Sequence, residues 1–320
     1  MRAFLIAITT AAAVVLPDAS RAQDYPTRNV SVVVPFPAGG GADLFARVLG
    51  QQLSVILGKP FIVENRAGAG GNIGAHAVVR AVPDGSTLLY TTSGLAISQA
   101  VYAKPLFDPE KELQPVSMTV SMPQVLVAHP SLPARNAQEF IALAKAKPGS
   151  IAYGADVGSA GHLTMEMLAA STGIRQHQVP YKGVAPIVTA LMSGEVQSAF
   201  LVIPLVKPHL ASGRMRAIGV SSAKRSSALP GIPTLQEEGV AGFEALQWHA
   251  FFAPARTPPH IVERLNAAIQ EALKSQHVNE RAVAEGAEVV RMTPAEFAGF
   301  FGRELARYRI IAKRSAISVQ

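Results

Sequence analysis

The chain has 320 residues, no cysteine, and 29 basic against 22 acidic side chains, which gives a formal charge of +7 at pH 7. The lack of cysteine excludes thiolate zinc sites, iron–sulfur clusters, a cysteine nucleophile and any disulfide framework. Because 49% of the residues are hydrophobic and only 16% are charged, the composition also excludes a disordered or coiled-coil protein. The length allows about two domains of ordinary size.

Residues 1–22 have the layout of a secretory signal peptide. Arg2 gives a positive start, residues 3–16 form an uncharged and mostly apolar run, and Ser20 and Ala22 place small residues before a cut. Such a run is too short to span a bilayer core of about 30 Å. We therefore expect cleavage after Ala22 and a periplasmic location; an uncleaved anchor or a buried N-terminal helix is the alternative.

The mature chain then alternates between strand and helix patterns. Short apolar runs rich in β-branched residues predict strands at 30–35, 61–63 and 87–91, with helices at 43–57 and between the glycine loop 68–71 and residue 82. Alternation at this pace predicts an α/β fold in which helices cover both faces of a parallel sheet.

A second series of strands and helices follows. Strands are predicted at 124–128, 151–153, 178–181, 198–203, 217–221 and 246–253, and helices are predicted to start near residues 136, 161, 183, 259 and 294. Residues 293–296 read Thr-Pro-Ala-Glu, which is a capping box with proline at the first helical position.

The first candidate binding element is the turn at residues 35–43, Pro-Phe-Pro-Ala-Gly-Gly-Gly-Ala-Asp. It joins the end of a strand to the start of a helix, where glycines leave the backbone N–H groups uncovered and the helix N-terminus adds partial positive charge. Such a turn can bind a carboxylate or phosphate without a cationic side chain. A plain structural turn would show the same pattern.

A second turn of this kind covers residues 153–162, where Ser159 can cap the following helix, and a third is Ser93-Gly94. Because these turns belong to two separate series of strands and helices, they suggest a ligand held between two lobes.

Other chemistry is poorly supported. The glycines at 68, 70 and 74 do not match a dinucleotide fingerprint, and the chain has no nucleophile elbow, zinc-protease motif or P-loop. His162 and Glu166 could bind a metal, but they lack a third ligand nearby, and Trp248 could line a pocket but is more often a core residue. We therefore expect no enzyme, no metal and no cofactor. The basic last helix is expected to be a solvated face and not a nucleic-acid site.

Seven segments together resemble the Bug family of periplasmic solute-binding proteins, the binding components of tripartite tricarboxylate transporters. The matching segments are residues 34–43, 63–75, 83–89, 107–109, 179–183, 253–259 and 265–266. The resemblance implies a two-lobed Venus-flytrap fold of type II, with two crossover strands near 124–129 and 246–253. It places lobe 1 at 23–124 and 246–320, and lobe 2 at 125–245.

The resemblance also implies a ligand and its contacts. A small carboxylic acid would lie in the cleft, held mainly by backbone groups, and the partners would be the membrane subunits of the transporter. One side of the ligand would face Phe36, Ala38, Gly40, Gly41, Ala42 and Asp43, with Ser93 nearby; the other would face Gly158, Ser159, Ala160 and His162, with Tyr181 and Lys182 close by. The protein would act as a monomer.

One departure from the family pattern bears on the ligand. After Phe200, where the family often has an acidic or amide residue, this chain has Leu201, Val202 and Ile203. Our hypothesis is that the pocket favours an acid with an apolar or aromatic body over an amino acid. The leading function is capture of such an acid for transport. The alternatives are a ligand-sensing protein for a membrane receptor and, with less support, an exported α/β enzyme.

Overall fold

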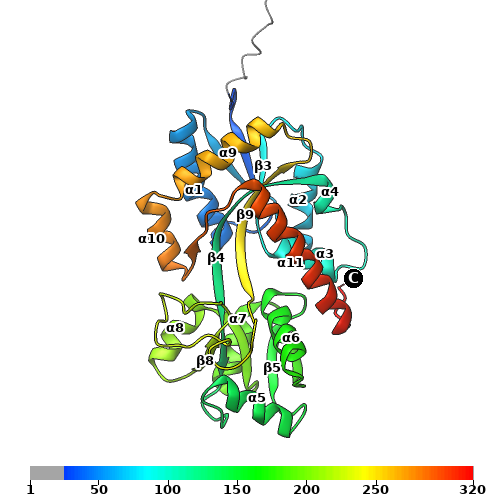
Figure 1. The fold of residues 1–320 in the computed structure, drawn as a ribbon, viewed down its shortest axis with the longest axis vertical. Coiled ribbons are helices and arrows are strands. Elements are labelled where there is room, and N and C mark those ends of the chain that lie inside the picture. The colour runs from blue at the N-terminus through cyan, green and yellow to red at the C-terminus, as the bar shows by residue number, and fades with distance from the viewer. Residues whose placement is uncertain (1–24, 320) are drawn as a thin grey trace, which may run out of the picture.

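A computed structural model describes residues 25–319 as two lobes joined end to end (Figure 1). The predicted signal peptide lies outside the described residues. Among residues 25–319, no helix combines the length and the apolar character needed to cross a membrane.

Lobe 1 is built around a short parallel sheet. The central strand β1 (Val30–Val34) pairs in parallel with β2 (Phe61–Asn65) and with β3 (Thr87–Thr92). All four valines of β1 are fully buried, including the consecutive residues Val32 and Val33, whose side chains point to opposite faces of the sheet. Both faces are therefore covered by helices. The helices of lobe 1 are α1 (Gly41–Leu57), η1 (Ala69–Gly71), α2 (Asn72–Val79), α3 (Gly94–Val101), α4 (Pro109–Glu112), α9 (Pro259–Ala272), α10 (Gln276–Ala284) and α11 (Pro294–Arg314).

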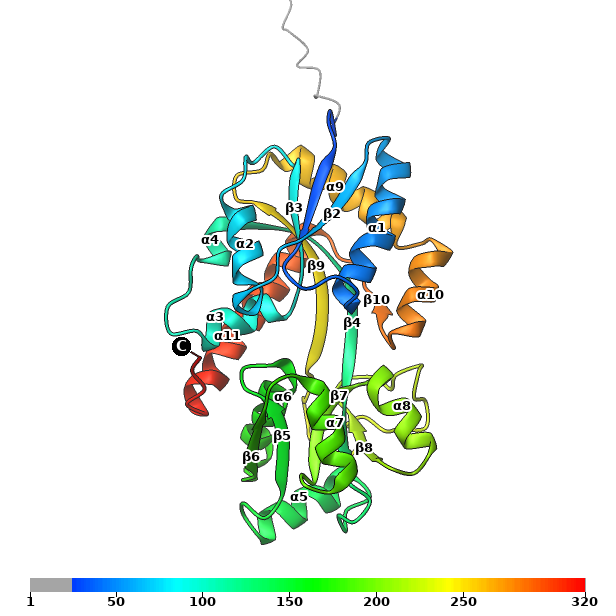
Figure 2. The ribbon, with the colours of Figure 1, turned by 180° about the vertical axis from the view of Figure 1, so that it is seen from behind.

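Two long strands run between the lobes. β4 (Leu113–Ala128) pairs antiparallel with β9 (Leu246–Pro254) as far as residue 123, and from residue 124 onward it pairs with strands of lobe 2. Figures 1 and 2 show both strands bridging the waist of the molecule. The predicted strand at 124–128 is therefore only the last part of β4. The sheet is mixed and not parallel as predicted, because the crossover strands and the short strand β10 (Glu288–Val289) pair antiparallel.

Lobe 2 repeats the plan of lobe 1 on a smaller scale. Its strands are β5 (Ala152–Asp156), β6 (His177–Tyr181), β7 (Ser198–Val202) and β8 (Arg216–Val220), and its helices are α5 (Ala137–Ala146), α6 (Ala160–Thr172), α7 (Val184–Ser193) and α8 (Ile203–Ala211). β5 is parallel to β6 and β7, whereas β7 and β8 pair antiparallel with the end of β4.

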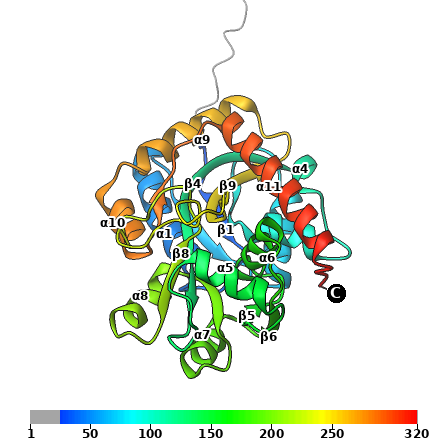
Figure 3. The same cartoon turned by 60° about the horizontal axis from the view of Figure 1, so that its bottom comes forward.

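The helix α11 ties the two lobes together at the back of the cleft. It contacts α3 of lobe 1 and α6 of lobe 2 (Figures 1 and 3). Its Phe297 and Phe301 pack edge-on against Trp248 of β9, with ring centroids 6.1 and 6.0 Å apart. Trp248 is fully buried and its indole N–H donates to Glu304 at 3.3 Å. Trp248 is therefore a core residue, as its residue type favoured.

Candidate functional site

Two adjoining cavities lie where the lobes face each other. The larger encloses about 410 Å³ and is lined from lobe 1 by Phe36 and the start of α3, and from lobe 2 by the loop before α6. The smaller encloses about 210 Å³ and lies against β5, β7 and α7. Both cavities share the residues Asp156, Ser159, Ala160 and Gln247. A ligand that filled both would therefore touch both lobes.

Lobe 1 presents the N-terminus of α3 to the larger cavity. Ser93 is the N-cap, its side chain makes no capping bond, and its N–H donates to the carbonyl of Trp248 at 2.9 Å. The Ser93 hydroxyl is buried and has no hydrogen-bond partner. A buried hydroxyl without a partner costs free energy, so this group is complementary to a polar ligand atom in the cavity.

Lobe 2 presents the N-terminus of α6 opposite α3. Ser159 caps the helix by accepting the N–H of His162 at 3.3 Å, and Gly158 turns the chain with a φ of +78°. The N–H of Gly158 donates to Nδ1 of His162 at 3.1 Å, which leaves the proton on Nε2. Burial lowers the pKa of His162, although Glu166 and Asp156 oppose that shift. His162 is therefore neutral, and its ring holds the turn at Gly158 through this hydrogen bond.

The carboxylate of Asp43 stabilises the first glycine turn through hydrogen bonds. It is buried and accepts hydrogen bonds from the backbone of Gly39 at 2.9 Å, from Arg47 at 3.1 Å and from Asn65 at 2.9 Å. Burial alone would raise the pKa of Asp43, but the hydrogen bonds from Arg47, Gly39 and Asn65 outweigh it and lower the pKa below its usual range. The carboxylate is thus ionised and fully engaged within lobe 1.

Comparison with known proteins identifies the family. Residues 45–317 match the tripartite tricarboxylate transporter family receptor. The chain is 38% identical to protein BugT of Bordetella pertussis over 93% of each chain. It belongs to this family. The predicted resemblance to Bug proteins is therefore confirmed.

Solved structures of relatives have the same fold. A Rhodopseudomonas palustris protein solved with adipate is 35% identical, covers 92% of this chain and 99% of its own, and superposes with a TM-score of 0.76. The malate-bound MatC protein of the same organism is 32% identical, covers 90% and 99%, and superposes with a TM-score of 0.73. The two-lobed periplasmic-binding-protein fold predicted for this receptor is confirmed.

The structure separates the predicted site residues of this receptor into two groups. Phe36, Ser93, Gly158, Ser159 and Ala160 line the larger cavity. The remaining predicted residues, Ala38, Gly40, Gly41, Ala42, Asp43, His162, Tyr181 and Lys182, line neither cavity.

Six of the eight residues outside the cavities have surroundings that the structure makes plain. Asp43 and His162 are hydrogen-bonded within their own lobes. Ala38 and Gly40 are exposed on the rim, while Gly41 lies next to the Glu285 carboxylate. The hydroxyl of Tyr181, at the carboxyl end of β6, donates to Glu195 at 2.7 Å.

Several cavity residues were missed by the sequence reasoning. Asp156 is the last residue of β5, Gln124 is where β4 passes from one lobe to the other, and Gln247 is near the start of β9. The available signal was position: in open α/β sheets, ligands bind at the carboxyl ends of the strands. Asp156 and Thr92 satisfy that rule.

The receptor shows no arrangement suited to a metal within residues 25–319, where no group of three His, Asp or Glu side chains could hold an ion. Glu166 instead accepts the hydroxyl of Tyr153 at 2.6 Å.

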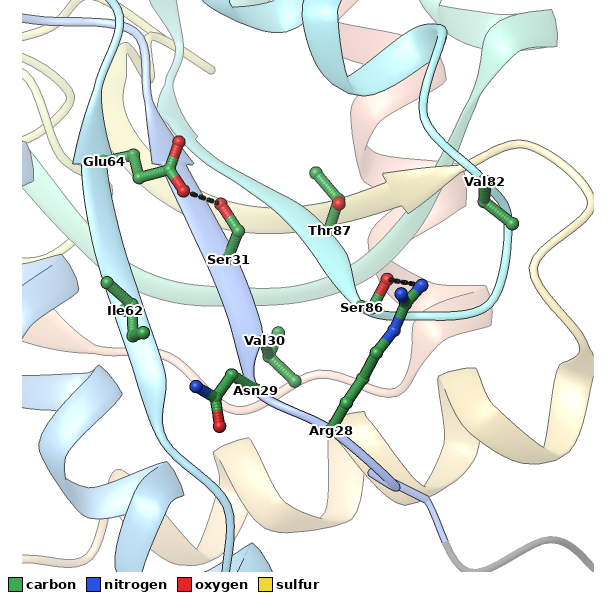
Figure 4. Close-up of a pocket in the computed structure, with 9 residues that line it drawn as sticks. All are labelled: Arg28, Asn29, Val30, Ser31, Ile62, Glu64, Val82, Ser86 and Thr87. Atoms are coloured by element: carbon green, nitrogen blue, oxygen red, sulfur yellow. Dashed lines mark hydrogen bonds between the residues drawn. The ribbon is translucent and has the colours of Figure 1, made fainter.

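A separate cavity of about 330 Å³ lies at the other end of the lobe 1 sheet (Figure 4). Ser31 donates to Glu64 at 2.9 Å across it, and Arg28 donates to Ser86 at 2.8 Å. Four of its polar side chains are therefore paired with one another. It sits at the amino ends of β1 and β3, which is the edge of a parallel sheet that ligands seldom use.

Proposed function

We propose that this receptor captures a small carboxylic acid between its two lobes and delivers it to the membrane subunits of a tripartite tricarboxylate-type transporter. The observation that carries the proposal is the cavity between the α3 and α6 N-termini, into which the unpartnered Ser93 hydroxyl is built. The adipate and malate bound to two relatives support the same class of ligand.

The chemistry of the cavity suits a carboxylate. The first N–H groups of a helix have no partner inside the helix, and the helix dipole makes that end partly positive. Helices from opposite lobes aim such ends at one space, and the Ser93 hydroxyl adds a donor. Because one ligand uses groups of both lobes, it binds a closed form better than an open form and shifts the population toward closure.

The predicted site residues outside the cavities take part in this proposal only when the lobes close. The turn at 38–42 and the pair Tyr181-Lys182 flank the cleft from opposite lobes, and we infer that they approach the ligand when the lobes close. Lobe 1 would move as residues 23–124 and 246–320, and lobe 2 as residues 125–245. The crossover strands would act as the hinge.

We further propose that the receptor is periplasmic, monomeric and not an enzyme. The leader pattern, with cleavage after Ala22, and the family support the location. Among the described residues that line the two cavities, no hydroxyl is hydrogen-bonded to a histidine or carboxylate side chain: Ser159 caps α6, Ser98 donates to Leu95 and Asn72, and Ser93 has no partner. Purified protein that converted a carboxylic acid in more than stoichiometric amount would contradict the proposal.

The ligand hypothesis from the sequence also stands as a proposal. Leu201, Val202 and Leu205 line the smaller cavity and form an apolar wall that can cover a hydrocarbon body. We expect acids with such a body to raise the thermal unfolding temperature more than aspartate or glutamate does. A screen in which aspartate or glutamate gave the largest shift would contradict this hypothesis.

The decisive test is to identify what the cleft holds. The mature protein is purified without denaturation, the small molecules it releases are identified by mass, and the affinity of each is measured by calorimetry. We expect a carboxylic acid at close to one molecule per chain. Release of a nucleotide, a sugar or a metal complex in that amount would overturn the proposal.

A further inference from the structure

The cleft contains one formal charge, and it is negative. Among the described residues that line the two cavities, Asp156 is the only Asp, Glu, Lys, Arg or His. His162, its neighbour, is neutral because burial lowers its pKa. The two helix N-termini supply about half a unit of positive charge each. A ligand carboxylate at these N-termini therefore meets positive partial charge. A second carboxylate deeper in the cavities finds no Lys, Arg or His among the residues that line them, and Lys182 on the rim lines neither cavity.

Asp156 occupies the junction between the cavities. It lines both of them, so a ligand that extends from the α3 end into the smaller cavity passes beside its carboxylate. Like charges a few ångströms apart in a poorly solvated cleft repel each other strongly. A negative charge at the far end of such a ligand would therefore weaken its binding.

The smaller cavity is also lined by a polar side chain without a partner. Gln124 is 3% exposed, and its side-chain Oε1 is buried with no hydrogen-bond partner. The surrounding wall is apolar, with Leu201, Val202 and Ile187. A hydrogen-bond acceptor left unpaired in such a place is costly, and a donor on the ligand would satisfy it.

We propose that Asp156 and Gln124 set the substrate class of this receptor: a monocarboxylic acid with an apolar body and a neutral hydrogen-bond donor, such as a hydroxyl, at its far end. The carboxylate lies at the α3 and α6 N-termini, the body lies along Leu201 and Val202, and the donor reaches Gln124 and Asp156. Dicarboxylates are disfavoured. The inference rests on the proposed function, and it separates this receptor from relatives that were solved with adipate and malate, both dicarboxylic acids.

The test measures the affinities of three matched ligand series by calorimetry at neutral pH: unsubstituted, ω-hydroxy and ω-carboxy acids of four to eight carbons. The wild-type mature protein is freed of bound ligand first. We expect the best ω-hydroxy acid to bind about tenfold more tightly than the unsubstituted and the ω-carboxy acid of the same length.

Three variants assign the effect to residues. Asp156→Asn should raise the affinity for the ω-carboxy acid by about fivefold or more, while changing that for the ω-hydroxy acid much less. Gln124→Met keeps the length of the side chain and should reduce the ω-hydroxy acid to the level of the unsubstituted one. Glu271→Gln removes the same charge from an exposed position on α9 and should change no ratio. Unfolding temperatures verify that all three are folded.

The outcomes distinguish the two proposals. If an ω-carboxy acid binds the wild type as tightly as the ω-hydroxy acid, or if Asp156→Asn leaves their ratio unchanged, the inference is wrong and the carboxylate receptor stands. If no acid of any series binds, the proposed function fails and the inference fails with it.

Discussion

Two serines of α3 line the same cavity but have different hydrogen bonds. The hydroxyl of Ser93 has no partner, whereas that of Ser98 donates to the carbonyl of Leu95 at 2.9 Å and to Asn72 at 3.2 Å. A hydroxyl that is free in the unliganded protein is available to a ligand, and one that is already bonded stabilises the fold. The pair therefore allows binding and stability to be measured apart.

We predict that Ser93→Ala weakens binding of the acid identified by mass about tenfold, because a hydrogen bond to a charged group is worth roughly 1.5–3 kcal/mol. Its thermal unfolding temperature should not fall, since no internal bond is lost. Ser98→Ala is the matched control and should lower the unfolding temperature instead. Unchanged affinity in Ser93→Ala, measured by calorimetry, would remove Ser93 from the site.

Asp43 shows how a site residue inferred from a motif can serve the fold. We predict that Asp43→Asn lowers the free energy of unfolding by about 2 kcal/mol. The amide is uncharged and has one acceptor oxygen, so it cannot accept all three hydrogen bonds from Arg47, Asn65 and Gly39. Urea denaturation at neutral pH measures the change. A variant as stable as wild type would show that these hydrogen bonds do not stabilise the fold.

The same carboxylate gives a pH dependence. The pKa of Asp43 is lower in the folded protein than its usual value, so its stabilising contribution is complete above the unfolded pKa. It is lost as the pH falls through the folded pKa. Wild-type stability should therefore decline more steeply than that of Asp43→Asn below about pH 4. Equal slopes for both proteins in urea titrations at a series of acidic pH values would contradict this assignment.

At the level of elements, a contact between the lobes depends on one glycine. Gly286, between α10 and β10, has a φ of +62°, and a methyl group there would lie 2.9 Å from Cβ of Ile203, which begins α8 in lobe 2. Left-handed backbone already costs a residue other than glycine about 1 kcal/mol. The close approach adds steric repulsion between the lobes.

We predict that Gly286→Ala lowers the free energy of unfolding by more than Gly58→Ala does. Gly58 has a similar φ of +69° with nothing within 4 Å, so it isolates the backbone cost. Combining Gly286→Ala with Ile203→Ala should recover at least about 0.5 kcal/mol relative to the sum of the single effects. Additive effects in the double variant would show that the two elements do not press on each other.

The elements that the sequence predicted best carry local signals. Asn136 accepts the N–H of Glu139 at 2.8 Å, and Thr293 and Glu296 form the predicted capping box. The start of β4 was missed because Pro115 and Pro123 argue against a strand. The structure accommodates Pro115 at an irregularity in the pairing with β9, and Pro123 where the pairing partner changes.

The site was predictable only in part, for a related reason. Ser93 and the 158–160 turn follow strands directly, so their places at the cleft could be inferred from the chain order. Sequence does not reveal where a hydrogen bond goes. Asp43 and His162 were predicted as ligand contacts, and the sequence did not show that each is also hydrogen-bonded to the backbone of its own loop. Gln124 and Gln247 reach the cleft only because the two crossover strands run side by side.

For the molecule as a whole, the predicted site implies closure. The glycine turn at 38–41 is on the rim, outside the cavities, so its N–H groups can serve a ligand only after the lobes approach. Gly40 has a φ of −76°, which suits proline. Gly40→Pro would thus remove one N–H with little strain, since the preceding Gly39 tolerates its left-handed φ of +85°.

We predict that Gly40→Pro abolishes binding of the acid identified by mass while the protein stays folded. Calorimetry measures the binding, circular dichroism verifies the fold, and small-angle scattering should show that wild type, but not the variant, becomes more compact on adding the ligand. Wild-type affinity in Gly40→Pro would show that this turn takes no part in the site.

The crossover strands also impose an order on assembly. β3 pairs with β9, and the side chain of Asn266 on α9 donates to the carbonyl of Val116 on β4. Lobe 1 therefore cannot complete its sheet until segments more than a hundred residues later have been synthesised. Every strand of lobe 2, by contrast, has been made once Val220 has been synthesised. A ribosome releases the N-terminal part first. The smaller lobe can thus complete its sheet while β3 still lacks its neighbour β9.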